Sequence, residues 1–542
     1  MSSVDGGGEA AEVESAERSG TDSTHDRRDW LSGSPWSRVD GVVASGLGLA
    51  VMGIAYVFRS VVTPTDPWHY VKSALSFPSD GWVPLGYTRY GIILATKPVG
   101  HLFGDAQVTY YFWPIFSAGL LAAAVYLLGR RWWGWEGGGL AVILLFSNAV
   151  VFYNLSRGYP DVMSMALFCL AIVLALRARD ARLAGRRDVL WLLAVGFLLG
   201  WGFEVRETSM LAWPLIAVIL WRRGAILRTA ALVATSLLFW AAVDVGISAW
   251  AYGDPLLKLH TLSGLDIAPG KAGGVSSHAA LIGQPRWFYF AVIPRAAWAA
   301  VGGFWMVALG ALAVMGLLVR DKVVRLFAGW FVGVYTLTVL AAGGLDPAHP
   351  GGSLDVARYW IPFFPAISIV VGALVVIVGR KLGERIQKAS PRLPRGRLIP
   401  TLVLAAFVSF GPVSFAAQYA TSYIGFAPNG GSALEDLRDH LRGSGPTTGR
   451  VWTDWETARI LPIYQRDFFG GKKVWTGSVK SLTGVGEPVP GDRVLLFSAR
   501  SSTCTFCRDA LRPWLLGHPQ VPSTWTKEYV ADKGNLTLYT VG

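Results

Sequence analysis

The sequence has 542 residues, of which 52% are hydrophobic and only 16% are charged, and its mean hydropathy is +0.40. These values exclude an ordinary water-soluble protein. The formal net charge of +13 does not indicate nucleic-acid binding, because the basic residues lie in short loops between apolar runs and not along one face. We therefore expect a membrane protein without a nucleic-acid partner.

The first 38 residues are polar and rich in Gly, Ser, Glu and Asp. They lack the short apolar core, followed by small residues, that a cleaved signal peptide needs. Such a composition buries too little apolar surface to fold. We predict that residues 1–38 form a disordered cytoplasmic tail.

Long apolar segments follow this tail. A helix that crosses ~30 Å of hydrocarbon needs ~20 mainly apolar residues. The segments that qualify are 40–60, 108–129, 138–156, 160–177, 189–203, 208–221, 229–251, 287–319, 324–342, 358–379 and 398–418. Pro294 and Arg295 interrupt the longest segment, which we expect to begin as an interfacial helix. The sequence thus predicts a polytopic α-helical membrane domain of about 11 transmembrane helices over residues 39–420.

The distribution of Lys and Arg predicts the orientation of these helices. With the N-terminus in the cytoplasm, the cytoplasmic loops hold 20 Lys and Arg, whereas the longer external loops hold 9. Cytoplasmic loops normally carry this excess. We expect a multi-pass protein of the plasma membrane with a cytoplasmic N-terminus. An odd number of spans places the C-terminal region outside the cytoplasm.

Residues 421–542 have a different composition, since charged residues increase and the apolar runs shorten to strand length. The strand candidates are VWTDW, KKVWTG, RVLLF and LTLYTV, with one helix at Ala433–Leu441 and another at Cys507–Leu516. This pattern predicts a small extracytoplasmic α/β domain. Cys504 and Cys507 form a CxxC sequence on this external side, and whether they form a disulfide is left open.

The first external loop begins with TPTDPWHYVKSA directly after the first span. Asp66 lies there at the membrane surface, with His69 and Tyr70 one helical turn further on. A carboxylate in this position can act as a general base. The alternative is that Asp66 caps the following helix, since Pro67 is typical of a first helical turn.

Two further external turns carry charged residues. The turn SRGYPD presents Arg157 and Asp161 between two spans, where a charge is costly unless it is paired or used. Asp161 either caps the following span after Pro160 or has a functional role. The turn FEVRET places Glu204, Arg206 and Glu207 close together. For FEVRET, salt bridges among its own three residues are the favoured interpretation.

A late span begins with ARYWIPFFPAI, which contains Arg358 and Tyr359. The forked guanidinium of Arg358 suits a phosphate, because its donors match two phosphate oxygens at once. The alternative is that Arg358 and Tyr359 reach the membrane interface, as these residue types do at helix ends. In GYTRYG, Tyr87 and Arg89 either line a substrate groove or belong to a lipid-facing amphipathic helix.

In their order along the chain, these features resemble the GT-C superfamily of membrane glycosyltransferases, especially the branch with protein O-mannosyltransferases and the lipid A aminoarabinose transferase. The resemblance covers about residues 40–420. It rests on Asp66 and Tyr70 after the first span, a long amphipathic first external loop, Asp161 after the third span, and RYWIPFFP at the start of a late span.

The resemblance implies an inverting transferase that takes a sugar from a polyprenyl-phosphate carrier and passes it to an acceptor hydroxyl. Asp66 matches the family's first-loop catalytic position and Asp161 its second acidic position. The implied phosphate-binding residues are Arg358, Arg206 and Arg157. The residues implied to line the substrate groove are His69, Tyr70, Tyr87, Arg89 and Tyr359.

The sequence predicts no certain cofactor. In some members of this superfamily the second acidic position helps to hold a divalent metal ion, and a metal at Asp66 and Asp161 therefore stays open. Many protein O-mannosyltransferases have an Asp-Glu pair in the first loop, whereas Pro67 follows Asp66 here. This difference weakens the expectation of a metal held by adjacent carboxylates.

Two other classes of protein remain as alternatives. A lipid or glycan transporter has many spans as well, but typically shows internal repeats, and none is evident in this sequence. A membrane-anchored envelope-assembly protein would place its function in residues 421–542. The sequence leaves open which sugar is transferred, whether the acceptor is an envelope glycan, a lipid or a protein, and the oligomeric state.

Overall fold

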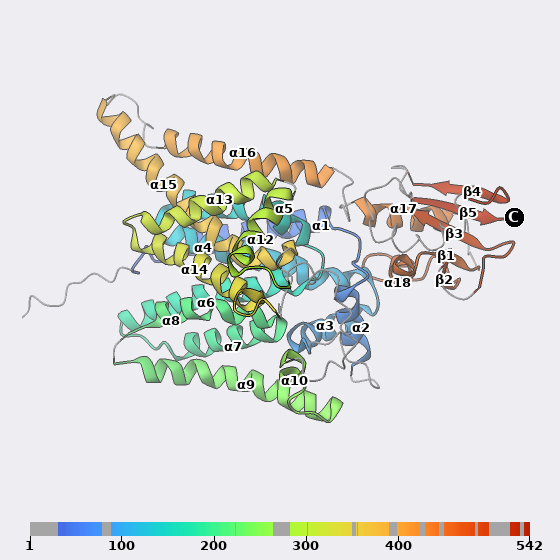
Figure 1. Ribbon diagram of the computed structural model, residues 1–542, viewed down its shortest axis with the longest axis horizontal. Coiled ribbons are helices and arrows are strands. Elements are labelled where there is room, and N and C mark those ends of the chain that lie inside the picture. Colours follow the sequence, from blue (N-terminus) through green and yellow to red (C-terminus); the bar gives the residue numbers. More distant parts are fainter. Residues whose placement is uncertain are drawn as a thin grey trace, which may run out of the picture.

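The structure is a computed structural model, and it describes residues 31–542 apart from several gaps. The gaps are 78–87, 223, 264–281, 301, 349–353, 355, 390–397, 422–428, 444–448, 483–485, 498–520 and 532–535. A bundle of helices occupies one part of the molecule, and a small sheet with two helices projects from one end of the bundle (Figure 1). Tyr87, Cys504, Cys507 and the helix expected at 507–516 lie outside the described residues.

The helices of the first half begin and end as follows: α1 Arg38–Val57, α2 Asp66–Ser76, α3 Tyr90–Phe103, α4 Gln107–Phe146, α5 Ala149–Asn154, α6 Pro160–Leu183, α7 Val189–Val205, η1 Glu207–Ala212, α8 Trp213–Leu220, α9 Ile226–Tyr252 and α10 Leu257–Ser263. The second half of the bundle contains α12 Arg286–Ala299, α13 Gly303–Met315, η2 Gly316–Leu318, α14 Lys322–Val339, η3 Leu340–Gly344, η4 Ala357–Phe363, α15 Phe364–Ala389 and α16 Ile399–Thr421. Each of the eleven predicted spans falls on helix within the described residues, which confirms the polytopic helical fold.

The predicted span 108–129 and the first part of 138–156 lie within the single element α4, and Gly134 separates them, while the rest of the second span continues into α5. Gly134 has φ 79°, which breaks the helix and reverses the chain. Small residues let the two arms approach closely: a Cβ on Gly129 would lie 2.9 Å from the carbonyl oxygen of Gly137, and one on Gly138 would lie 2.7 Å from that of Tyr126. The spans 108–129 and 138–156 therefore form a tight helical hairpin.

The longest predicted span is interrupted, but not where the sequence indicated. Pro294 lies inside α12, and the break falls at Gly302, whose φ is 71°. A proline is tolerated inside a membrane helix when neighbouring helices cover the freed carbonyl. The left-handed conformation of Gly302 then starts α13 in a new direction.

The end of the N-terminal tail is packed against the bundle, so residue 38 is too late as the boundary of a disordered segment. Leu31 and Trp36 are buried, with 1% and 7% of their surfaces exposed. The Trp36 indole donates to the carbonyl oxygen of Leu127 at 2.8 Å, and the Ser34 amide donates to that of Arg131. For residues 1–30 the disordered tail stays a prediction.

The C-terminal region folds around a five-stranded sheet of order β2-β1-β3-β5-β4. Its elements are α17 Asn429–Gly443, β1 Val451–Thr453, α18 Trp455–Tyr464, β2 Val479–Ser481, β3 Arg493–Phe497, β4 Trp525–Val530 and β5 Leu536–Val541. Strand β1 pairs in parallel with β2 and β3, whereas β5 is antiparallel to β3 and β4. The predicted α/β architecture is confirmed. The strand predicted at KKVWTG is wrong, because the strand that pairs with β1 begins only at Val479. Neither α18 nor β4 was predicted.

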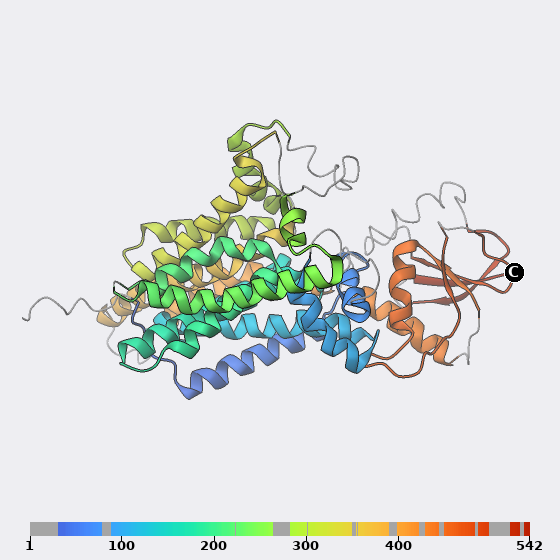
Figure 2. The same cartoon turned by 90° about the horizontal axis from the view of Figure 1, so that it is seen from below.

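Helices α2 and α3 lie at the junction between the bundle and the C-terminal domain, and α18 faces them (Figures 1 and 2). Helix α1 lies along the bundle and ends at this junction (Figure 2). The most deeply packed spans are α6 and α15, whereas α9 lies at the periphery with little buried surface. Residues just after α1 are thus enclosed between the two parts of the molecule.

Candidate functional site

A cavity of about 480 Å³ opens at the end of the bundle that carries the C-terminal domain. Its polar lining comes from Asp66, Asn154, Arg157 and Arg358, together with the hydroxyls of Thr65, Tyr153 and Tyr159. Ala149, Val150, Ala300, Val356 and Ala357 supply an apolar wall. A cavity that combines cationic groups with an apolar wall suits an amphiphilic anion.

Asp66 is the first residue of α2, and its carboxylate faces the cavity. Its Oδ2 lies 3.3 Å from Nη2 of Arg358. Thr65 is the N-cap residue of α2, and no side chain forms a capping hydrogen bond at this end of the helix. The alternative role of Asp66 as the capping residue is therefore wrong. Asp66 retains 33% of its side-chain exposure, which leaves the carboxylate accessible to a substrate.

Asp161 lies in the first turn of α6 and is completely buried. Its Oδ1 is 2.8 Å from Nη1 of Arg206, which is itself 10% exposed. Arg206 ends α7 and also donates from Nε to the hydroxyl of Thr208 at 3.1 Å. The two residues form a buried ion pair, which favours orientation of neighbouring groups over direct proton transfer by Asp161.

Three arginines and three tyrosines alternate beside these carboxylates, with guanidinium carbons 4.0 to 5.6 Å from ring centroids. We call this the Arg–Tyr ladder, and its members in order are Arg206, Tyr359, Arg358, Tyr159, Arg157 and Tyr153. The aromatic faces stabilise guanidinium groups that would otherwise repel one another. With Asp66 and Asp161, the three arginines have a net charge of +1.

Arg358 is the member of the ladder that is closest to Asp66. Its Nε is buried and has no hydrogen-bond partner among the described residues. A buried donor of this kind is costly unless a ligand or water satisfies it. The excess positive charge and the unsatisfied donor of Arg358 both favour an anionic ligand in the cavity, and a phosphate fits the forked guanidinium.

The FEVRET turn does not form the internal salt bridges that the sequence favoured. Lys258 pairs with Glu204 at 2.6 Å, Asp161 with Arg206, and Arg89 approaches Glu207 at 4.0 Å. The turn directs its three charges toward three different elements. Because helix α7 ends at Val205 and η1 begins at Glu207, successive side chains point in different directions.

The first-loop residues flank the cavity. The hydroxyl of Tyr70 accepts a 2.7 Å hydrogen bond from Arg89, and burial raises the pKa of Tyr70, which keeps its hydroxyl protonated. Burial, followed by the positive charge of Arg459, lowers the pKa of His69. His69 and Tyr70 lie on α2 next to Asp66. The residues that line the cavity do not include four that were expected in the substrate groove: His69, Tyr70, Arg89 and Tyr359.

Sequence reasoning missed Tyr153 and Tyr159, which complete the ladder. Tyr159 lies inside the SRGYPD turn, two residues after Arg157, and it is the residue before the first proline of α6. That position in a charged turn is a usable signal. Tyr153 is on α5, and only the tertiary contact with Arg157 identifies it.

The described residues contain no group of three His, Cys, Asp or Glu side chains that could hold a metal ion. Asp66 and Asp161 each face an arginine, and a guanidinium in that place competes with a divalent cation. These residues therefore do not fit a metal site.

Comparisons with known proteins show which proteins this chain is similar to. The family model for dolichyl-phosphate-mannose-protein mannosyltransferase matches residues 94–248. The undecaprenyl phosphate-alpha-4-amino-4-deoxy-L-arabinose arabinosyl transferase 2 of Sodalis glossinidius is 26% identical over 190 residues, which are 32% of this chain and 34% of the relative. The match thus spans about a third of the length of that relative.

The fold is similar to that of ArnT from Cupriavidus metallidurans in the apo state. The TM-score is 0.50 at 13% identity, over 93% of this chain and 98% of ArnT. ArnT bound to undecaprenyl phosphate gives a TM-score of 0.48 at 12% identity, with the same coverage. The comparisons together confirm the resemblance to GT-C glycosyltransferases and the multi-pass membrane fold.

Proposed function

We propose that this protein is an inverting glycosyltransferase that moves a sugar from a polyprenyl-phosphate carrier to an acceptor hydroxyl on the external face of the plasma membrane. The observation that carries the proposal is the 3.3 Å approach of Asp66 to Arg358 in a cavity that Arg157 also lines. A base and cations for a leaving phosphate are thus adjacent. The family match and the similarity to an undecaprenyl-phosphate-dependent transferase support the same chemistry.

In this mechanism Asp66 accepts the proton of the acceptor hydroxyl. The acceptor oxygen forms a bond to the anomeric carbon, while the bond from that carbon to the phosphate oxygen breaks and its electron pair stays on the phosphate. Positive charge grows on the sugar and negative charge on the phosphate. Arg358 and Arg157 stabilise the leaving phosphate, and Arg206, held by Asp161, supports the ladder.

Charges at one end of the bundle support the proposed orientation. Arg130, Arg131, Arg179 and Arg182 lie at the end opposite the C-terminal domain, where α4 reverses and α6 ends. The positive-inside rule places that end in the cytoplasm. The cavity and the C-terminal domain are then external, where a lipid-linked donor meets an envelope glycan, lipid or protein acceptor.

The test is transfer of labelled sugar from a panel of polyprenyl-phosphate donors, with wild type compared with Asp66→Asn. The substitution keeps the shape of the side chain and removes the base, so we expect the rate to fall by about 10² to 10⁴-fold with donor binding retained. Asp105→Asn is the matched control, because Asp105 has the same 33% side-chain exposure and pairs with Lys72 at 2.5 Å outside the cavity.

Full transfer by Asp66→Asn would show that Asp66 is not the base. An absence of transfer by the wild type with every donor would overturn the proposed function. A transporter would instead move the lipid-linked sugar between leaflets without breaking its bond to phosphate, which analysis of the lipid product detects.

A further inference from the structure

Residues 58–65 connect α1 to α2 and carry Asp66 at their end. Ser60, Val61, Val62 and Thr63 are at least 95% buried, although the segment belongs to neither helix nor strand. Buried backbone groups need hydrogen-bond partners, and here no regular structure supplies them. The partners that hold this segment therefore determine where Asp66 lies.

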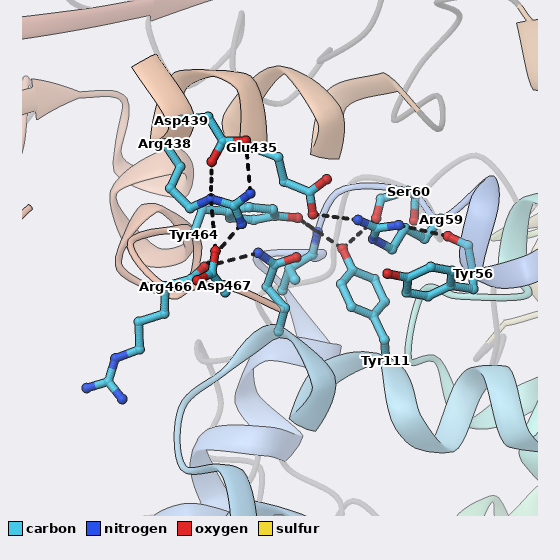
Figure 3. Close-up of polar contacts among 12 residues, drawn as sticks. Tyr56, Arg59, Ser60, Tyr111, Glu435, Arg438, Asp439, Tyr464, Arg466 and Asp467 are labelled. Carbon is cyan, nitrogen blue, oxygen red and sulfur yellow. Dashed lines mark hydrogen bonds and ion pairs between the residues drawn. The ribbon is translucent and has the colours of Figure 1, made fainter. Parts of the chain in front are cut away.

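A chain of hydrogen bonds joins the segment to the C-terminal domain (Figure 3). The Val62 amide donates to the hydroxyl of Tyr464 at 3.0 Å, and the hydroxyl of Tyr111 donates to the carbonyl oxygen of Ser60 at 2.6 Å. The two hydroxyls are 2.9 Å apart. Since Tyr111 uses its proton on Ser60, Tyr464 must donate to Tyr111.

Tyr464 is thus the central member of this chain, because it accepts from Val62 and donates to Tyr111. It lies on α18 of the C-terminal domain, about four hundred positions away in the sequence. Its burial raises its pKa to about 12, so the hydroxyl is protonated at neutral pH. Without the hydroxyl, the Val62 amide would be buried without a partner.

Arg459, also on α18, contacts the chain on both sides of Asp66. Its Nη1 donates to the carbonyl oxygen of Pro64 at 3.2 Å, and its own carbonyl oxygen accepts from the indole of Trp68 at 3.2 Å. The guanidinium lies over the rings of Trp68 and Trp455, with centroid distances of 5.4 and 4.5 Å. Pro64 and Trp68 bracket Asp66 in the sequence.

Further contacts fix α17 and the loop after α18 to the same region. Arg59 pairs with Glu435 at 2.5 Å, and both side chains are less than 20% exposed. The ring of Phe468 stacks on Tyr111 and packs edge-on against Tyr56. The C-terminal domain therefore contacts the segment that precedes Asp66 through α17, α18 and the loop after α18 (Figure 3).

We propose that α18 of the C-terminal domain positions the catalytic base, with Tyr464 and Arg459 as positioning residues that hold residues 60–65 so that Asp66 faces Arg358. This inference rests on the proposed function. A transferase base must lie within hydrogen-bond reach of the acceptor hydroxyl, and small displacements of a reacting group are costly. The C-terminal domain thereby takes part in turnover through the geometry of Asp66, without itself touching the donor.

Tyr464→Phe tests the proposal in the full-length protein in detergent or nanodiscs. It removes one oxygen and retains the ring. We expect faster hydrogen exchange in a peptide that spans residues 58–65, and a fall in kcat of about 10- to 100-fold with the KM for the lipid-linked donor unchanged. Tyr539→Phe is the matched control on β5 of the same domain, and it should behave as wild type in both measurements.

Arg459 supplies a second, graded variant. Arg459→Lys retains a donor for Pro64 and should recover part of the kcat that Arg459→Met loses. A merely structural role for α18 predicts instead that all variants lower the amount of folded protein and leave kcat per folded molecule unchanged.

The outcomes are separable. Unchanged exchange at residues 58–65 in Tyr464→Phe would overturn the hydrogen-bond chain, and faster exchange with normal kcat would overturn the positioning role. If wild type and Asp105→Asn transfer no sugar, the proposed function fails and the positioning of a base fails with it, whereas the exchange experiment still decides whether α18 holds the segment.

Discussion

Both ends of the helical bundle contain arginines, aromatic rings and aspartates, yet the two clusters are built differently. At the end opposite the C-terminal domain, Arg131 is 1% exposed and donates two hydrogen bonds to Asp180, at 2.8 and 2.7 Å. Arg130 pairs with Asp40 at 2.7 Å, and Trp36 lies 5.0 Å from the guanidinium of Arg131. We call these five residues the closed cluster.

The Arg–Tyr ladder at the other end contains the same residue types but a different ratio of arginines to carboxylates. Its three arginines outnumber the two carboxylates, and it borders a cavity of about 480 Å³. In the closed cluster each arginine has its own carboxylate. The difference teaches that residue type alone does not identify a site. An excess of arginines over carboxylates beside an open cavity is more informative, because charge in that place is costly unless a ligand uses it.

Arg358→Gln is the sharpest test of this contrast. The substitution removes the charge and the fork beside Asp66, so transfer should fall by about 10² to 10³-fold, as for loss of one donor to a developing anion. Thermal stability should not fall, because relief of an excess charge offsets lost contacts. Rates of labelled-sugar transfer and a melting curve in detergent measure both. Arg358→Lys should recover only part of the rate, since a lysine lacks the fork. Retention of full activity by the Gln variant would remove the basis for a phosphate site.

For Arg131→Ala in the closed cluster we predict the opposite result: stability falls, whereas binding of the donor does not change. The substitution leaves Asp180 without its bidentate partner and opens space beside Trp36, so the free energy of unfolding should fall by about 3 kcal/mol. This is the lower part of the range for a broken buried pair, because Asp180 is 33% exposed. The melting midpoint should drop, and the KM for the donor should stay at the wild-type value. A changed KM with normal stability would mean that the two ends do not divide the roles as proposed.

The smallest predicted effect is a pH dependence of stability that arises from His69, which lies at the junction near the ladder. Burial and Arg459 lower its pKa below the ordinary value of 6.5, so the unfolded chain binds a proton more readily than the folded protein does. The stabilisation that this difference provides is complete above pH 6.5 and is lost as the pH falls from 6.5 through the lowered pKa. The melting midpoint should therefore decline on acidification less steeply in His69→Gln than in wild type. Equal slopes would show that His69 does not contribute.

The sequence was informative about the site to different degrees. Asp66, Asp161, Arg206, Arg157 and Arg358 were selected one by one from short external turns, and the structure brings them together around the ladder. The sequence did not predict which of these residues form ion pairs with one another. Arg206 meets Asp161 and not its neighbours in FEVRET, because the end of α7 directs adjacent side chains to different helices. Tyr153 could not be selected at all, since an aromatic residue near a span end is ordinary in a membrane helix.

The sequence by itself determined the order of the apolar helices, the presence of a small sheet region after them, and the candidate charged residues. Hydrophobicity and charge are local properties that have a direct energetic cost in a bilayer. The tertiary structure alone decided which arginines are balanced by carboxylates, where α4 reverses, and that α18 holds the segment before Asp66. These features depend on contacts between residues up to about four hundred positions apart, such as Tyr464 with Val62. No local pattern encodes a contact of that kind, since its energy exists only once both parts of the molecule are folded.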